Sequence, residues 1–160
     1  MVTLKADLSK ISFLSGDQTK LDDVRELWER LNKHHHQKST HFKPYYEAMT
    51  FPKRKLSLVA KAAKGEMLVE LAIDTEKNVK VGYCITSIDS DRTGEVESIY
   101  VLESYRGMGI GDRFMKSALT WMQEKQAAKK IVIVGAGNEQ AFGFYERYGF
   151  RLRKTMLEQI

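Results

Sequence analysis

The chain has 160 residues, of which 42% are hydrophobic and 29% are charged, an ordinary balance for a globular domain. We therefore expect one domain over residues 1–160. The only cysteine is Cys84, which excludes an intramolecular disulfide and argues against a cysteine-based zinc site. No apolar run reaches the roughly 20 residues that cross a bilayer, and the first residues lack the apolar segment of a signal peptide. We expect a cytoplasmic protein without a membrane partner.

The net charge is +5, from 26 basic and 21 acidic residues, and the basic residues are densest between Lys38 and Lys64. A nucleic-acid surface would combine clustered Lys and Arg with aromatic residues in a docking motif. Here the cations alternate with apolar residues at helical spacing. This pattern indicates a solvated helix face or, alternatively, a nearby anionic ligand, and we expect no nucleic-acid partner.

The first third of the chain predicts a strand followed by helices. Apolar residues alternate loosely over residues 1–14, which predicts the strand. Thr19, with Asp22 three residues later, predicts a helix start, and apolar residues then recur at helical spacing. A second helical stretch covers residues 42–63 and is expected to bend or break near Pro52.

From residue 67 the apolar period changes to two. Apolar and polar residues alternate over residues 67–74 and 79–86 on either side of a turn-rich segment, which predicts an antiparallel hairpin. Cys84 lies in the second strand, where a small buried side chain is the plain interpretation and a reactive thiol is the alternative. A third strand is expected over residues 95–101.

The last third begins with a glycine-rich turn, residues 106–111, that leads into a long amphipathic helix. Residues 131–134 form a continuous apolar run, the pattern of a strand buried on both faces. A short helix over residues 140–148 and a final strand from Phe150 follow. This order of elements predicts an α/β fold in which a mixed sheet carries helices on both sides.

A strand that ends in closely spaced glycines and opens a helix forms a cradle for an anion such as phosphate. Glycines allow the backbone to approach closely, and the free N–H groups and dipole of the helix attract negative charge. A P-loop needs Lys and Ser or Thr after the last glycine, but Asp112 and Arg113 follow Gly111. A dinucleotide fingerprint needs glycine at position 112. The plain alternative is a glycine-rich helix start without a ligand.

The turn R-G-M-G-I-G matches the R/Q-x-x-G-x-G/A signature of the GNAT superfamily of N-acetyltransferases. Upstream, I-Y-V-L-E-S-Y is similar to the family's fourth strand, although Glu103 stands where proline is frequent. Downstream, the chain resembles the family block N-x-x-A-x-x-F-Y-E-x-x-G-F. Its residues there are Asn138, Ala141, Phe144, Tyr145, Glu146, Gly149 and Phe150.

This resemblance implies a single-domain GNAT fold, with a mixed, mostly antiparallel sheet of about six to seven strands. It implies an enzyme that transfers an acetyl group from its cosubstrate acetyl-CoA to a primary amine by direct attack. The acceptor would be a small molecule, a peptide N-terminus or a lysine side chain. The first 65 residues, which shape the acceptor pocket in this family, carry no signature. The alternative function is an acyl-CoA sensor without turnover, and a homodimer is left open.

By the same resemblance, the backbone of Ile99, Tyr100 and Val101 binds the pantetheine arm where their strand diverges from its neighbour. Asn138 hydrogen-bonds the cofactor or, alternatively, caps a helix. The pyrophosphate would be held by a run of seven residues. They are Arg106, Gly107, Met108, Gly109, Ile110, Gly111 and Asp112.

Tyr145 resembles the family tyrosine beside the thioester sulfur, where a phenol can protonate the departing thiolate. Packing in the core is the alternative. The incoming amine is protonated at neutral pH and must lose a proton before it attacks. Glu97 is the first candidate for the base and Glu95 the second, with a solvent-facing position as the alternative for each. In a regular strand these two share a face with Ile99 and Val101, whereas a bulge would change that phase.

Three consecutive histidines, His34 to His36, suggest a metal site at first sight. On a helix such residues point about 100° apart and cannot converge on one ion. Zinc sites use wider spacings, such as i and i+4, with further ligands. We therefore expect a polar helix end and no metal.

Overall fold

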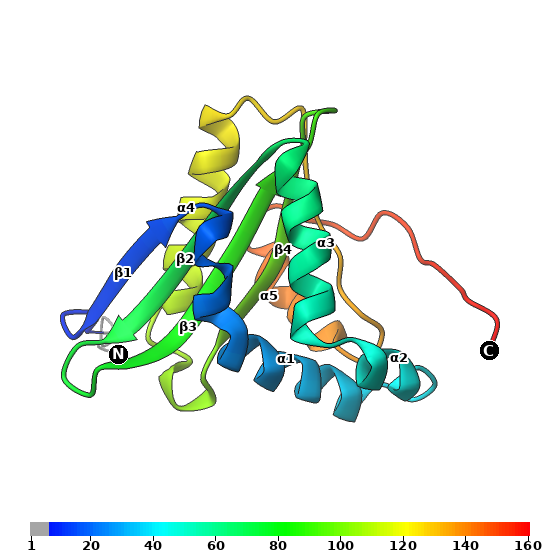
Figure 1. Ribbon diagram of the computed structural model, residues 1–160, viewed down its shortest axis with the longest axis horizontal. Coiled ribbons are helices and arrows are strands. Elements are labelled where there is room, and N and C mark those ends of the chain that lie inside the picture. Colours follow the sequence, from blue (N-terminus) through cyan, green and yellow to red (C-terminus); the bar gives the residue numbers. More distant parts are fainter. Residues whose placement is uncertain (1–6) are drawn as a thin grey trace.

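The computed structural model describes residues 7–160 and shows a five-stranded sheet between helices (Figure 1). The strand order is β1-β2-β3-β4-β5. The pairs β1–β2, β2–β3 and β3–β4 are antiparallel, and the pair β4–β5 is parallel. The strands are β1 (Ile11–Gly16), β2 (Glu66–Asp74), β3 (Val79–Ile88), β4 (Thr93–Val101) and β5 (Lys129–Val132). The mixed, mostly antiparallel α/β fold and the hairpin are confirmed. Of the first strand predicted over residues 1–14, residues 1–6 lie outside the described residues.

Helices cover both faces of the sheet (Figure 1). The first and third helices lie over one face with the short second helix beside the end of the first, and the last two lie over the other face. They are α1 (Arg25–Lys38), α2 (Lys43–Ala48), α3 (Phe51–Ala63), α4 (Ile110–Glu124) and α5 (Phe142–Glu146), with short 3-10 helices η1 (Gln18–Val24), η2 (Glu103–Tyr105) and η3 (Glu139–Ala141). In the part of the chain that the structure describes, no helix is long and apolar enough to cross a bilayer.

Capping side chains set where the early helices begin. The Asp17 carboxylate accepts a hydrogen bond from the Thr19 amide at 2.9 Å, so the helical path begins as η1, slightly before the predicted start. Thr50 caps α3 through the Lys53 amide, and Pro52 occupies its first turn. The predicted break near Pro52 is confirmed, because α2 ends before this cap and α3 starts after it.

Each face of the sheet carries its own hydrophobic core. In β2, Val69 and Leu71 point toward α1 and α3, and Ala72 points toward α4. The largest fully buried side chains on the two faces are Tyr83 and Phe114. Full burial of a large apolar side chain contributes roughly 1.5–3 kcal/mol, so these two cores hold the helices in place.

Strand β4 contains a bulge at Glu97. In the pairing with β3, Ser98 lies opposite Ile85 and Val96 lies opposite Thr86. Glu97 therefore has no partner residue in β3. A bulge of this kind places two residues against one and changes the phase of the side chains beyond it.

The bulge changes which residues of β4 share a face. Val96 packs in the core beneath α4, and so do Ile99 and Val101 after the bulge. Glu95 and Glu97 point to the opposite face, toward α3. The prediction that Ile99 and Val101 share a face with the two glutamates is thus wrong, and the alternative of a bulge is confirmed.

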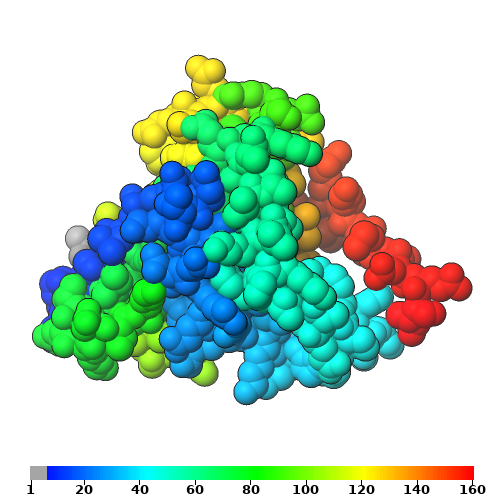
Figure 2. Space-filling view, in the orientation of Figure 1, coloured from blue at the N-terminus to red at the C-terminus, as the bar shows by residue number. Residues whose placement is uncertain are grey.

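The final strand predicted from Phe150 does not form. Phe150 itself packs against Tyr145, but residues 151–160 have no regular structure and project from the domain (Figures 1 and 2). Three cations within residues 151–154 favour solvent over a buried strand position. The described chain therefore has five strands, fewer than the predicted six to seven.

Strand β5 is also less buried than predicted. It ends at Val132 and is only half-buried, and Ile133 is 77% exposed. The prediction of burial on both faces is wrong because, within residues 7–160, β5 is the last strand of the sheet, without a strand on its outer side.

Cys84 is fully buried in β3. Burial raises the pKa of its thiol to about 12, so the thiolate is not formed at neutral pH. The interpretation as a small buried side chain is confirmed.

The carboxylate of Glu70 is buried between β2 and α4. Its Oε2 accepts a hydrogen bond from the Ser117 hydroxyl at 2.7 Å, whereas Oε1 has no hydrogen-bond partner among the described residues. Burial raises the pKa of Glu70, and the Ser117 hydrogen bond and the charge of Arg113 oppose this only in part. The folded protein therefore binds this proton more tightly than the unfolded chain. This proton binding stabilises the fold fully below the ordinary pKa of 4.5. The contribution to the free energy of unfolding is lost as the pH rises through the raised pKa of Glu70.

Glu70→Gln keeps the shape of the protonated side chain but cannot ionise. Between pH 5 and pH 8 we expect the wild-type free energy of unfolding to fall by about 1–3 kcal/mol more than that of the variant, the cost of an unpartnered buried group. Urea denaturation at both pH values measures this difference. Glu66→Gln, at the exposed start of β2, is the control and should keep the wild-type pH dependence. Equal pH dependence of Glu70→Gln and wild type would contradict the prediction.

Candidate active site

The glycine-rich turn joins β4 to α4. Gly107 and Gly109 have φ angles of 79° and 91°, the left-handed region that favours glycine. Apart from the glycine itself and its two chain neighbours, no atom of residues 7–160 lies within 4 Å of the position that a Cβ would take on either residue. The backbone conformation thus requires glycine, and the space above it is open to a ligand.

The start of α4 offers unpaired N–H groups beside these glycines. Gly109 is the N-cap, and the Arg113 amide makes the first hydrogen bond of the helix, to the Gly109 carbonyl at 3.0 Å. The amides of Ile110, Gly111 and Asp112 precede that bond and lack partners within the helix. Together with the dipole of a 15-residue helix, they form a site for an anion such as a pyrophosphate.

The carboxylate of Asp112, in the first turn of the same helix, is bound by neighbouring side chains. It accepts a hydrogen bond from the Tyr148 hydroxyl at 2.6 Å and pairs with Lys116 at 2.8 Å. The hydrogen bonds from Lys116 and Tyr148 hold the pKa of Asp112 below its usual value. These partners offset the negative charge of the Asp112 carboxylate. The backbone amide of Asp112 can therefore still act as a donor to an anion.

The rest of the turn is braced by neighbouring elements. Arg106 donates from Nε to the Val101 carbonyl at 2.9 Å, and its guanidinium lies 5.5 Å from the centre of the Tyr100 ring. Ile110, the first residue of α4, is buried, and Met108 is half-buried. These contacts fix the turn against the end of β4.

Strands β4 and β5 diverge beyond their first few pairs. Their pairing covers only residues 93–96 and 129–132, although β4 continues to Val101. The backbone of Ile99 to Val101 therefore has no strand partner on the β5 side. The predicted divergence is confirmed, and the binding of a pantetheine arm to this free edge stays a prediction.

A cavity of about 90 Å³ lies in the gap between the diverging strands. It has room for an acetyl group and a few water molecules. Residues of α1, β4, α5 and the segment after β5 line it. They are Leu31, His35, Val96, Glu97, Ser98, Ile99, Val132, Ile133, Val134, Gly135, Asn138 and Tyr145.

Tyr145 of α5 and Asn138, just before η3, line this cavity together with residues of α1. The Tyr145 ring packs against Phe144 and Phe150, so it both contributes to the core and lines the cavity. Burial raises the pKa of Tyr145 well above its ordinary value, so the phenol keeps its proton at neutral pH. Asn138 accepts a hydrogen bond from Gln140 and makes no capping bond to the backbone of η3.

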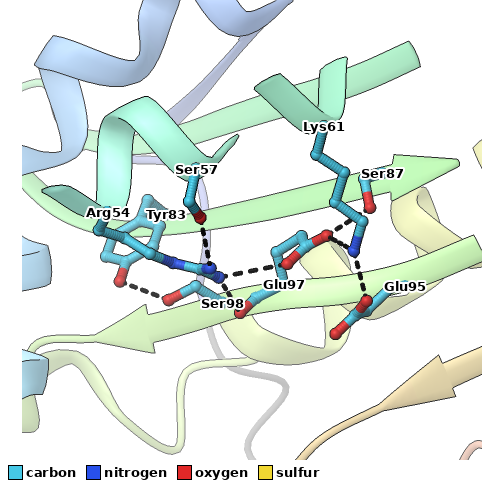
Figure 3. Close-up of polar contacts among 8 residues, drawn as sticks. All are labelled: Arg54, Ser57, Lys61, Tyr83, Ser87, Glu95, Glu97 and Ser98. Carbon is cyan, nitrogen blue, oxygen red and sulfur yellow. Dashed lines mark hydrogen bonds and ion pairs between the residues drawn. The ribbon is translucent and has the colours of Figure 1, made fainter. Parts of the chain in front are cut away.

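Both candidate bases are held in ion pairs with α3 (Figure 3). The Glu97 carboxylate, 4% exposed, contacts Lys61 and accepts from the Ser87 hydroxyl at 2.6 Å through one oxygen. Its other oxygen lies 3.2 Å from Arg54. Glu95 lies 2.5 Å from the same Lys61 amine. The solvent-facing alternative is therefore wrong for both glutamates.

Lys61 is held charged by this arrangement. Burial by itself would lower the pKa of Lys61, but the hydrogen bonds to Glu95 and Glu97 outweigh it and raise the pKa above its ordinary value. Arg54 also donates to the Glu97 carbonyl at 3.3 Å. The network brings together two cations of α3 and two carboxylates of β4.

Sequence reasoning missed Arg54, Lys61 and His35. Arg54 and Lys61 belong to the basic stretch read as a solvated helix face or an anion site, but the structure pairs them with Glu97 and Glu95. Their seven-residue separation places them on one face of α3, two turns apart, which is the signal that could have found them. No sequence signal places His35 in the cavity, because that position depends on how α1 lies across the sheet. Within residues 7–160, no three His, Cys, Asp or Glu residues are grouped to hold a metal ion.

The acetyltransferase (GNAT) family model matches residues 21–150, and the chain belongs to this family. It is 41% identical over 64 residues to mycothiol acetyltransferase of Corynebacterium aurimucosum, which is 40% of this chain and 21% of that protein. It is 33% identical over 66 residues to N-alpha-acetyltransferase of Sulfurisphaera tokodaii, 41% of this chain and 40% of that protein. The matches thus span well under half the length of these relatives.

Solved structures share the fold at low sequence identity. A putative acetyl transferase from Pyrococcus furiosus has a TM-score of 0.67 and 20% identity, over 93% of this chain and 99% of that chain. The PaiA N-acetyltransferase from Thermoplasma acidophilum, in complex with coenzyme A, has a TM-score of 0.70 and 18% identity, over 91% and 92%. These likenesses establish the α/β fold over almost the whole chain.

Gly109→Val should weaken acetyl-CoA binding, because the side chain would occupy the open space over the turn and oppose its left-handed backbone. Loss of one charge-assisted hydrogen bond corresponds to a roughly 10- to 100-fold rise in Kd. Calorimetric titration with acetyl-CoA measures it. Gly149→Val is the matched control, since Gly149 has a φ of 88° and equally open surroundings but lies outside the turn. Unchanged affinity in a folded Gly109→Val variant would refute the assignment of this turn.

Proposed function

We propose that this protein is an acetyl-CoA-dependent N-acetyltransferase that moves an acetyl group onto a primary amine. One observation carries the proposal: three binding features follow one another along a single stretch of chain. Residues 96–99 of β4 line the cavity, residues 99–101 form the free strand edge, and residues 107–112 form the anion cradle. Their order suits the thioester, the amide-bearing arm and the pyrophosphate of one extended coenzyme A molecule.

Two structural neighbours support this cosubstrate. The Thermoplasma acidophilum protein is in complex with coenzyme A, and the aminoglycoside acetyltransferase AAC(6')-Iy is in complex with a bisubstrate analog that contains CoA. In this chain, the donors at the start of α4 and the open space over Gly107 and Gly109 fit such a ligand.

Tyr145 is the proposed acid. When the amine nitrogen attacks the carbonyl carbon, the C–S bond breaks and the sulfur departs as a thiolate. A protonated phenol that lines the cavity can supply the proton to this leaving group. The raised pKa of Tyr145 keeps that proton available at neutral pH.

A base is also needed, since the acceptor arrives as an ammonium ion. The resemblance implies Glu97, with Glu95 in reserve, and both stay predictions. Each is already paired with Lys61, and Glu97 is paired with Arg54 as well.

The acceptor is proposed only as a primary amine. Relatives are named for mycothiol, N-alpha and aminoglycoside acetylation, which are three different acceptor classes. Since the β4–β5 gap and the turn would hold coenzyme A, the amine would approach from the side of α1 and α2. A cytoplasmic location, a homodimer, a single domain over residues 1–160 and the absence of nucleic-acid or membrane partners stay predictions.

The test is thiol release from acetyl-CoA with a panel of amines. The panel contains a polyamine, an amino sugar, a peptide with a free N-terminus, and a peptide with a blocked N-terminus and an internal lysine. We expect stoichiometric thiol release and an acetylated product with one class. Binding of acetyl-CoA without thiol release above the hydrolysis background would favour the alternative, a sensor without turnover.

Tyr145→Phe removes the proton donor but keeps the ring. We expect kcat to fall by about 10²- to 10⁴-fold, the usual value of general acid catalysis, with acetyl-CoA affinity near wild type. Steady-state kinetics and calorimetry separate these two effects. Tyr105→Phe is the control, because its hydroxyl bonds to Asp74 and does not line the cavity. Full kcat in Tyr145→Phe would leave Tyr145 with a packing role only.

A further inference from the structure

Three residues with ionisable side chains are among those that line the cavity: His35 of α1, Glu97 of β4 and Tyr145 of α5. If the proposed acetyl transfer takes place there, the proton of the acceptor ammonium must pass to one of them or to water. Tyr145 keeps its own proton at neutral pH. Among these three residues, the choice is between Glu97 and His35.

Glu97 is fully engaged by its neighbours. One oxygen accepts from Ser87 and contacts Lys61, and the other pairs with Arg54 (Figure 3). A carboxylate bound by two cations and a hydroxyl has its charge satisfied. A proton taken up there would weaken both ion pairs at a site that is almost closed to solvent.

His35 is half-buried in the last turn of α1, with its ring stacked on Tyr46 at 5.7 Å. The neighbouring His36 differs, because its Nε2 pairs with Glu47 at 2.9 Å and so faces a carboxylate. In the described residues, the only fully buried side-chain N or O atom without a hydrogen-bond partner is Oε1 of Glu70. The ring nitrogens of His35 are not among such atoms, and His35 is one of the residues that line the cavity.

The charge state of His35 is set by burial. Burial lowers the pKa of His35 below 6.5, and the nearby His34 lowers it further. The other ionisable groups around it are Tyr46 of α2, Tyr145 of α5 and Glu97, whose charge Lys61 and Arg54 offset. At neutral pH the imidazole is thus neutral and holds a free lone pair.

We propose that His35 takes the proton from the acceptor ammonium, directly or through one water molecule in the cavity. The amine lone pair that this releases forms the N–C bond, and the electron pair of the broken C–S bond goes to sulfur. Tyr145 protonates the sulfur and recovers a proton from the amide nitrogen. His35 then releases the first proton to solvent, so the reaction yields amide, free thiol and one proton.

The test is the pH dependence of kcat/KM for one good amine substrate. With a neutral base that accepts the proton, the wild-type profile has an acid limb below pH 6.5 and is flat from there to the pKa of the amine. His35→Gln should lower kcat/KM by about 10²-fold at pH 7 and remove the flat region between pH 6.5 and the amine pKa. Its rate should rise about tenfold per pH unit up to the amine pKa, since only free amine then reacts.

A second substitution at His35 and a control histidine accompany this test. His35→Phe keeps a ring to stack on Tyr46, and it should show the same profile as His35→Gln if the imidazole nitrogen is what matters. His41→Gln, an exposed histidine beyond α1, should keep the wild-type profile. Circular dichroism confirms that each variant is folded.

The outcomes separate this inference from the function on which it rests. Wild-type thiol release with an unchanged profile in both His35 variants would overturn it. So would a tenfold rise per pH unit up to the amine pKa in Glu97→Gln alone, because the base would then be the carboxylate. No thiol release from wild type with any amine would instead refute the acetyl transfer itself.

Discussion

One extra residue in β4, Glu97, is the constraint on which the site depends. Because Glu97 has no partner in β3, the strand changes phase there. Its carboxylate meets α3, whereas Ile99 and Val101 turn to the core beneath α4. The pairing of β4 with β5 ends at Val96, one residue earlier, so the cavity opens where the strand changes phase.

The bulge points the Glu97 carboxylate toward α3, and this buried charge needs a partner of opposite charge. A charged group with almost no exposure is costly unless it is paired and hydrogen-bonded. Lys61 and Arg54, on one face of α3, meet this requirement together with Ser87 (Figure 3). The ion pairs therefore fix the position of α3 over β4 at the level of the cavity. They also leave His35 as the ionisable side chain there that can accept a proton.

The two halves of the site have different physical origins. The anion cradle is local: left-handed glycines and free amides at one helix start suffice for it, whatever lies elsewhere in the chain. The opposite wall comes from α1, which is packed across the sheet by Leu27 and Trp28. A fold shared with other acetyltransferases accounts for the first half, and under the proposed function the acceptor would meet the second.

The sequence by itself determined the elements whose signals are local. The hairpin β2–β3, the break before Pro52, the turn at Gly107 and Gly109, and helix α4 all follow from short-range periodicity and backbone preference. It did not determine the final strand, because the apolar residues after Phe150 are offset by cations and by the absence of a packing surface. Only the tertiary structure decided that Glu97 would meet residues some 40 positions earlier and that His35 of α1 and Tyr145 of α5 would line one cavity. Such contacts depend on how whole elements pack, and no short window of sequence contains that information.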